Sequence, residues 1–209
     1  DTDPYETKNL ANDPEHKAIL LDLRNRLNTW VKGMPDLSFY PEHHLIGEAF
    51  DNPVAFGQKH KKEIEKYIEI ADLGLLNFRE AENSLTQALD SFDPWERYWA
   101  IIVCSTFGEQ ANGMESQIKS IATNDTELIN KVRAAEFLGI VKKLDPSLVM
   151  TNALYATEKP SEALLILNSI VLMTSSNYNY NFNIERDKMS KVVTEDPEVM
   201  RRLEFLNVL

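Results

Sequence analysis

The chain has 209 residues, of which 43% are hydrophobic and 26% are charged, so it is long enough and apolar enough to bury a substantial core. Lys and Arg number 22 against 33 Asp and Glu, and the resulting net charge of −11 argues against nucleic-acid binding and against a polybasic membrane-surface protein. The single cysteine, Cys104, excludes an internal disulfide and a cysteine-based zinc site.

The sequence contains no apolar run that approaches the ~20 residues of a membrane-spanning helix. The most apolar stretch, 163–173, is interrupted by Asn168 and Ser169. The chain starts at Asp1 without a methionine or a signal peptide, which suggests a fragment or a processed form and leaves the compartment open.

Five Asp-Pro dipeptides punctuate the sequence, and four of them precede apolar residues at helical spacing. An Asp side chain accepts hydrogen bonds from the free amides of a first helical turn, and a proline at the next position loses no hydrogen bond there. The pattern therefore predicts helix starts at Asp13, Asp93, Asp145 and Asp196, and a turn at Asp3.

The first predicted helix is amphipathic and covers about five turns after Asp13. Its apolar residues recur at steps of three, four and three, so they share one face of the helix and form an apolar stripe: Leu20, Leu23, Leu27 and Trp30. Prolines and glycines then gather in residues 33–57, which predicts an irregular connector.

The remaining sequence predicts further helices and no strand, because its apolar residues follow a period of 3.6 and hairpin dipeptides are missing. The helices are expected near 58–72, 79–90, 94–107, 114–122, 126–143, 147–156, 160–174, 185–193 and 197–206. A polar-aromatic loop is expected at 175–183. The fold class is therefore all-α.

The helices after residue 79 form a degenerate repeat of about 30–35 residues, the length of a two-helix unit. Residues 95–108 can be laid over 131–140, and a looser copy covers 162–170. The aligned pairs are Ala100 with Ala135, Val103 with Leu138, and Cys104 with Gly139. The pattern resembles HEAT or armadillo repeats and predicts a right-handed α-solenoid, with an irregular helical bundle as the alternative.

We accordingly divide the chain into a tail, 1–57, and a helical-repeat domain, 58–209. The tail carries Asp3-Pro4-x-Glu6-x-x-Asn9-Leu10-Ala11-x-Asp13-Pro14, then the apolar stripe, then Pro41-Glu42. This series resembles the C-terminal end of sulfatases of the arylsulfatase and N-sulfoglucosamine sulfohydrolase type. In that family an amphipathic helix follows the motif and packs on a small C-terminal subdomain, and some members continue into a HEAT-like extension.

The resemblance implies a non-catalytic C-terminal domain of a protein that hydrolyses sulfate esters, periplasmic or exported if the source is bacterial. Sulfatases use formylglycine, made from Cys or Ser in C/S-x-P-x-R, together with calcium. Here Cys104 is followed by Ser-Thr-Phe-Gly and lacks that motif. None of the family's catalytic residues can be carried over, so we expect no cofactor in this chain and no sulfatase activity from it alone.

His43 and His44 are the one cluster that suggests catalysis, with Glu42, Glu48 and Asp51 nearby. A stand-alone hydrolase built on this pair is one alternative function, and a glycan-binding module is the other. Adjacent histidines in an extended loop point apart, however, and the spacing is not that of a metal site such as H-E-x-x-H. A solvated or hydrogen-bonded pair is the simpler interpretation, and Cys104, on an apolar helix, is expected to be a buried thiol.

Aromatic residues offer a second candidate surface. Trp95 could present a platform to a sugar, although its helical spacing also suits packing between layers. Tyr178, Tyr180 and Phe182 alternate with Asn, as in carbohydrate-contacting loops, or pin the loop to the last helices. The expected partners are the sulfatase catalytic domain, a second copy through helix 14–31, and a sulfated glycan, with no nucleic acid.

Overall fold

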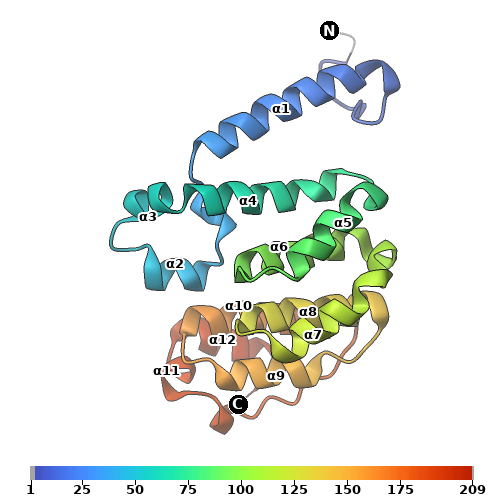
Figure 1. Ribbon diagram of the computed structural model, residues 1–209. Helices are drawn as coiled ribbons and strands as arrows, with labels where there is room; N and C mark the ends of the chain where they lie inside the picture. Colours follow the sequence, from blue (N-terminus) through green and yellow to red (C-terminus); the bar gives the residue numbers. More distant parts are fainter. Residues whose placement is uncertain (1–2, 209) are drawn as a thin grey trace.

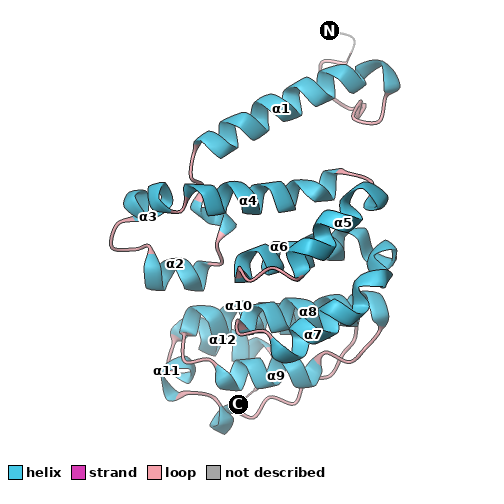
Figure 2. Ribbon diagram, viewed as in Figure 1, coloured by secondary structure: helices cyan, strands magenta, loops and turns pink. Residues whose placement is uncertain are grey.

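The Asp-Pro dipeptides begin helices as the sequence predicts. Asp93 and Asp196 each accept hydrogen bonds from two amides of the helix that follows. Asp13 accepts from the amide of Glu15, and Asp145 accepts from the amide of Ser147. The computed structural model describes residues 3–208, and within them every regular element is a helix (Figures 1 and 2). The all-α class is confirmed.

The helices follow one another with short connections. The N-terminal part has η1 (Pro14–His16), α1 (Lys17–Gly33), η2 (Leu37–Phe39), α2 (Glu42–Glu48), α3 (Pro53–Lys59), α4 (Lys61–Asp72) and η3 (Leu73–Leu75). The middle has α5 (Phe78–Leu89), α6 (Pro94–Phe107), η4 (Gly108–Met114), α7 (Glu115–Asn124) and α8 (Leu128–Lys142). The last part has α9 (Ser147–Ala156), α10 (Pro160–Thr174), η5 (Arg186–Lys188), α11 (Lys191–Thr194) and α12 (Pro197–Phe205).

Helices close in sequence pack side by side, as the layered view in Figure 1 shows. Helix α6 lies against α4, α5 and α8, and α8 in turn lies against α7, α9 and α10. One apolar core joins α4, α6, α8, α9, α10 and α12, and a second joins α5, α6, α7 and α8. The right-handed solenoid and the domain boundary after residue 57 remain predictions.

The expectation of an irregular connector over 33–57 is wrong, because this segment contains η2, α2 and α3. Its prolines start helices instead of only breaking them: Pro41 is the N-cap of α2 and Pro53 is the first residue of α3. The Asn52 side chain also caps α3 by accepting from the amide of Ala55. Prolines in these positions cost no helical hydrogen bond.

Two other boundaries differ from the prediction. The helix expected over 58–72 is divided at His60, which lies between α3 and α4 with non-helical dihedral angles. The helix expected over 185–193 is wrong, because this stretch holds only η5 and the short α11, with Ser190 as the N-cap of α11. Short apolar patterns of this kind predict a helix without fixing its ends.

We expect Phe137→Ala to lower the free energy of unfolding by about 3–5 kcal/mol, because Phe137 is fully buried in the second core and its removal leaves a cavity. Urea denaturation measures the change. Phe205→Ala, at an exposed position on α12, is the matched control and should change stability by less than about 0.5 kcal/mol. Equal losses in the two variants would contradict this core assignment.

Candidate functional site

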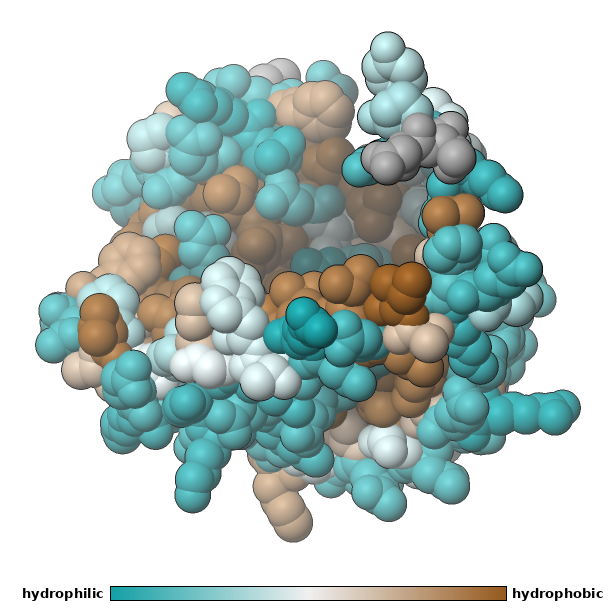
Figure 3. All heavy atoms as spheres, turned by 90° about the horizontal axis from the view of Figure 1, so that it is seen from above, coloured by the Kyte–Doolittle hydropathy of each residue, from teal (hydrophilic) through white to brown (hydrophobic). Residues whose placement is uncertain are grey.

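Helix α1 carries an apolar face that the described part of the chain leaves open. None of its residues is buried, and Leu23, Leu27 and Trp30 are 57%, 59% and 62% exposed. Ile19 beside them is also exposed. Figure 3, which views the molecule from above, shows apolar surface gathered between hydrophilic borders. The predicted stripe therefore faces solvent in this structure instead of packing on the helices below it.

Two polar contacts near its C-terminal end hold α1 to α4. The Asn28 amide donates to the Asp72 carboxylate, and the Lys32 ammonium pairs with Glu69 at 3.1 Å. Val31 adds an apolar contact to the first core. The N-terminal half of α1 projects beyond this attachment (Figure 1). Helices in proteins gain most of their stability from packing an apolar face, so the open face of α1 is a candidate contact surface.

His43 and His44 lie on α2, not in an extended loop, which corrects that part of the expectation. His43 is only 3% exposed, and its Nε2 atom lies 3.4 Å from Oε1 of Glu162 on α10. The other carboxylate oxygen of Glu162 accepts a hydrogen bond of 2.7 Å from the Thr157 hydroxyl. His44 stacks on the Tyr40 ring. The pair thus connects α2 to the core, and its predicted role in hydrolysis remains untested.

Burial controls the charge of this pair. Desolvation, aided by Lys159 and His44, lowers the pKa of His43 to about 4. Burial also lowers the pKa of His44. Near neutral pH, His43 is therefore an uncharged imidazole beside a buried carboxylate.

Trp95 is 5% exposed and packs among Tyr40, His43 and His44. The prediction that its ring is offered to a sugar does not fit this burial, and the alternative of packing between layers does. The Trp99 indole donates a 2.8 Å hydrogen bond to the Phe39 carbonyl, which ties α6 to η2.

Tyr178, Tyr180 and Phe182 are half-buried against the first core. The Tyr180 hydroxyl donates to the Gly139 carbonyl at 2.9 Å, so this loop is pinned to α8. The structure brings neither these rings nor Trp95 together with α1. Ligand binding by the loop remains a prediction.

Cys104 does not fit a formylglycine precursor. The thiol is buried in α6, and burial raises its pKa to about 12. Within residues 3–208, no group of three or more His, Cys, Asp or Glu side chains is placed to hold a metal ion. The calcium and formylglycine that the sulfatase resemblance implies remain expectations for the parent protein.

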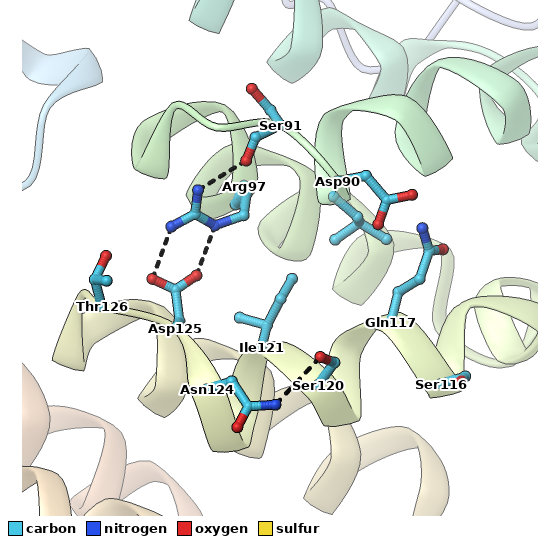
Figure 4. A pocket seen from close by; sticks show the side chains of 11 residues that line it. Asp90, Ser91, Arg97, Ser116, Gln117, Ser120, Ile121, Asn124, Asp125 and Thr126 are labelled. Carbon is cyan, nitrogen blue, oxygen red and sulfur yellow. Dashed lines mark hydrogen bonds and ion pairs between the residues drawn. The ribbon is translucent and has the colours of Figure 1, made fainter.

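Arg97 on α6 and Asp125 at the end of α7 form an ion pair that was not predicted from the sequence. The Arg97 guanidinium binds the carboxylate through Nε and Nη2 at 2.7 and 2.9 Å, and the Asp125 side chain is 1% exposed (Figure 4). Nη1 of Arg97 also donates to the carbonyls of Ser91 and Phe92. The sequence offered one signal for Asp125, its position directly before a predicted helix. Nothing in the sequence indicated that Arg97, 28 residues earlier, would be its partner.

A shallow hollow of about 450 Å³ opens beside this pair, between the α5–α6 turn and α7 (Figure 4). Asp90, Gln117, Ser120 and Asn124 line it. Asn124 and Ser120 hydrogen-bond to each other, at 3.4 Å. The walls are polar and no aromatic ring lines the hollow.

No helix in the described range is long and apolar enough to cross a membrane. No protein-family model matches the chain, and no solved structure matches it significantly. A curated protein, an ulvan-active sulfatase from Formosa agariphila, is 40% identical to it over 50 residues. The match covers 24% of this chain and spans 8% of the length of that sulfatase. The chain is thus similar to part of a sulfatase over about a quarter of its length.

Breaking the Arg97–Asp125 pair should destabilise the fold. We expect Asp125→Ala to cost about 3 kcal/mol in urea denaturation, because it leaves the largely buried Arg97 without its counter-charge. Arg97→Ala should cost a similar amount, and the double variant clearly less than the sum. Arg201→Ala, which removes the exposed pair with Glu198, is the control and should stay within about 0.5 kcal/mol. Additive losses would contradict direct coupling.

Acidification should destabilise the fold through His43. The pKa of His43 in the folded chain, about 4, lies below the ordinary histidine value of about 6.5, so the unfolded chain binds the proton more tightly. The contribution is complete above pH 6.5 and is lost as the pH falls towards 4. Compared with His43→Gln, which does not titrate there, the wild-type chain should lose about 2 kcal/mol more stability across this range. Parallel pH profiles of the two proteins would contradict a neutral buried His43.

Proposed function

We propose that this chain is a non-catalytic helical domain of a sulfatase, and that α1 docks it onto the sulfatase catalytic domain. Two observations support the relationship: the 50-residue similarity to the ulvan-active sulfatase, and the resemblance of residues 3–14 to the sulfatase C-terminal motif. By this proposal the parent protein hydrolyses sulfate esters, and a sulfated polysaccharide is its substrate class. The active site lies in the catalytic domain and not in this chain.

The open apolar face of α1 carries the proposal. Its spacing of three, four and three is that of the a and d positions of a coiled coil, which bury their side chains only against another element. The helices from α4 to α12 already bury apolar residues of their own in two cores. Helix α1 is therefore the element whose apolar surface requires a partner from outside the described residues.

Charge indicates the kind of partner. Four cationic side chains and one carboxylate give α1 a net charge of +3, although the whole chain carries −11. Arg24 and Arg26 lie near the middle of the stripe, so an antiparallel pairing of α1 with its own copy brings arginines close to arginines. An apolar face bordered by carboxylates fits better than a second α1.

Covalent linkage also favours a partner in the same polypeptide. The exposed stripe offers roughly 450 Å² of apolar surface, close to the apolar share of the roughly 800 Å² per partner that is usual between separate chains. Contacts between domains of one polypeptide form more readily than contacts between separate chains, because the linkage raises their effective concentration. Charge and linkage, rather than area, therefore favour a catalytic domain in the same polypeptide over a second copy of this chain.

Hydrogen exchange tests the docking. In the complete sulfatase polypeptide, amides of α1 should exchange at least about tenfold more slowly than in the 209-residue chain, because docking lowers the fraction of open helix. Leu23→Glu with Leu27→Glu should abolish the added protection. Leu148→Glu, at an exposed apolar position on α9, is the matched control and should keep it.

Two further measurements separate the outcomes. Equal exchange of α1 in the two proteins would refute the docking, and a concentration-dependent dimer of the 209-residue chain in light scattering that Leu23→Glu with Leu27→Glu abolishes would assign the stripe to self-association. Release of sulfate from a sulfated polysaccharide by the complete polypeptide, but not by this chain, tests the sulfatase assignment. Absence of that activity from the complete polypeptide would refute the assignment.

A further inference from the structure

The turn between α5 and α6 displays an aromatic ring entirely in solvent. Phe92 is 102% exposed, the highest value among the exposed large hydrophobic residues of the described chain. Its neighbours in the turn, Asp90, Ser91 and Asp93, are polar. A lone exposed apolar residue needs no explanation in itself, so what matters is how this one is held and what surrounds it.

The turn is braced from behind by the buried ion pair. Nη1 of Arg97 donates to the Ser91 carbonyl at 2.8 Å and to the Phe92 carbonyl at 3.1 Å (Figure 4 shows the first). Asp125 holds the guanidinium by two further hydrogen bonds. The Ser91 hydroxyl accepts from the amide of Asp93 at 3.1 Å. The backbone that carries Phe92 is thereby fixed before any ligand arrives, which lowers the entropy cost of binding.

Phe92 stands at the edge of a hollow of about 330 Å³ between α4, α5 and the turn. The hollow is distinct from the one in Figure 4 and meets it only at Ser91. Ile70, Leu73 and Ala88 supply apolar surface on its sides. Its volume lies at the lower end of the range for small-molecule sites and suits a single sugar ring.

The rim of this hollow carries polar groups with free hydrogen-bonding capacity. Within residues 3–208, the side chains of Ser84, Gln87 and Glu96 make no hydrogen bond to protein. They offer a hydroxyl, an amide and a carboxylate, which together donate to and accept from neighbouring hydroxyl groups. Lys66 and Lys32 both pair with Glu69, so Glu96 is the rim carboxylate without a cation beside it.

We propose that this hollow is a subsite for a neutral sugar unit of a polysaccharide. An aromatic face packs well against the C–H face of a pyranose, and hydroxyl, amide and carboxylate groups at the rim recognise its hydroxyls. Phe92 stacks on the ring, and Ser84, Gln87 and Glu96 bind the hydroxyls. Two carboxylates, Glu69 and Glu96, and one ammonium, Lys66, line the hollow, so its net negative charge disfavours a sulfate or uronate and favours an uncharged unit.

This subsite stands on the geometry of the turn and not on the sulfatase relationship. It uses none of the aromatic residues that the sequence singled out: Trp95 is buried, and the loop rings lie on the first core instead. Failure of α1 to dock therefore leaves the subsite intact, and the converse also holds.

Affinity electrophoresis of the 209-residue chain in native gels tests the proposal, with xylan, laminarin or galactomannan as neutral probes and dextran sulfate as the charged probe. We expect retardation by at least one neutral polysaccharide. Phe92→Ala should weaken that binding about tenfold, and Phe92→Tyr, which keeps the ring, should stay within about twofold. Phe205→Ala removes an exposed ring elsewhere and should bind like wild type.

Phe92 is fully exposed, so its replacement should leave the thermal unfolding midpoint unchanged and any loss of binding is local. Absence of retardation in all three neutral gels would overturn the proposal. So would retardation by dextran sulfate only, or retardation by a neutral polysaccharide that Phe92→Ala leaves unchanged.

Discussion

The fold depends on α8 being buried on two sides at once. Ile129, Val132 and Ala135 face the first core, and Phe137 and Leu138 belong to the second. A helix in this position needs apolar residues around most of its surface and small residues where neighbours cross closely. Gly139 shows the constraint: a Cβ atom there would lie 2.5 Å from Cε of Met173 and 3.2 Å from Cγ of Pro146. The surface of α8 therefore limits how closely the helices on either side can pack.

Polar groups then fix how α6 crosses α8. Asn130 is fully buried, and its amide donates to the Pro94 carbonyl at 2.9 Å. It also lies 3.4 Å from both oxygens of Asp125, which binds Arg97. Apolar burial does not specify an angle, whereas the directed hydrogen bonds of a buried carboxylate, guanidinium and amide allow few arrangements. The same network reaches the α5–α6 turn, so it sets a surface feature as well as a core contact.

The helices after α1 bury most of their apolar residues in two cores, whereas α1 leaves its stripe exposed. His43 and His44, the pair that suggested chemistry, lie on α2, and burial lowers the pKa of His43 to about 4. The lone thiol is buried and protonated. What the chain presents outward is an apolar helix face of net positive charge and a rigid turn with an exposed ring. The two proposals rest on these features.

The sequence by itself determined the helical class, the helix starts at Asp-Pro dipeptides and the stripe of α1, because capping and 3.6-residue periodicity act within a few residues of chain. It could not place Trp95, whose spacing suits either a buried or an exposed ring, and it misjudged 33–57, where prolines at first helical positions look like breaks. It gave no sign that Arg97 would meet Asp125 and hold Phe92 outward. Only the tertiary structure decided these points, because they depend on which distant helices share a core and on which faces are left without a neighbour.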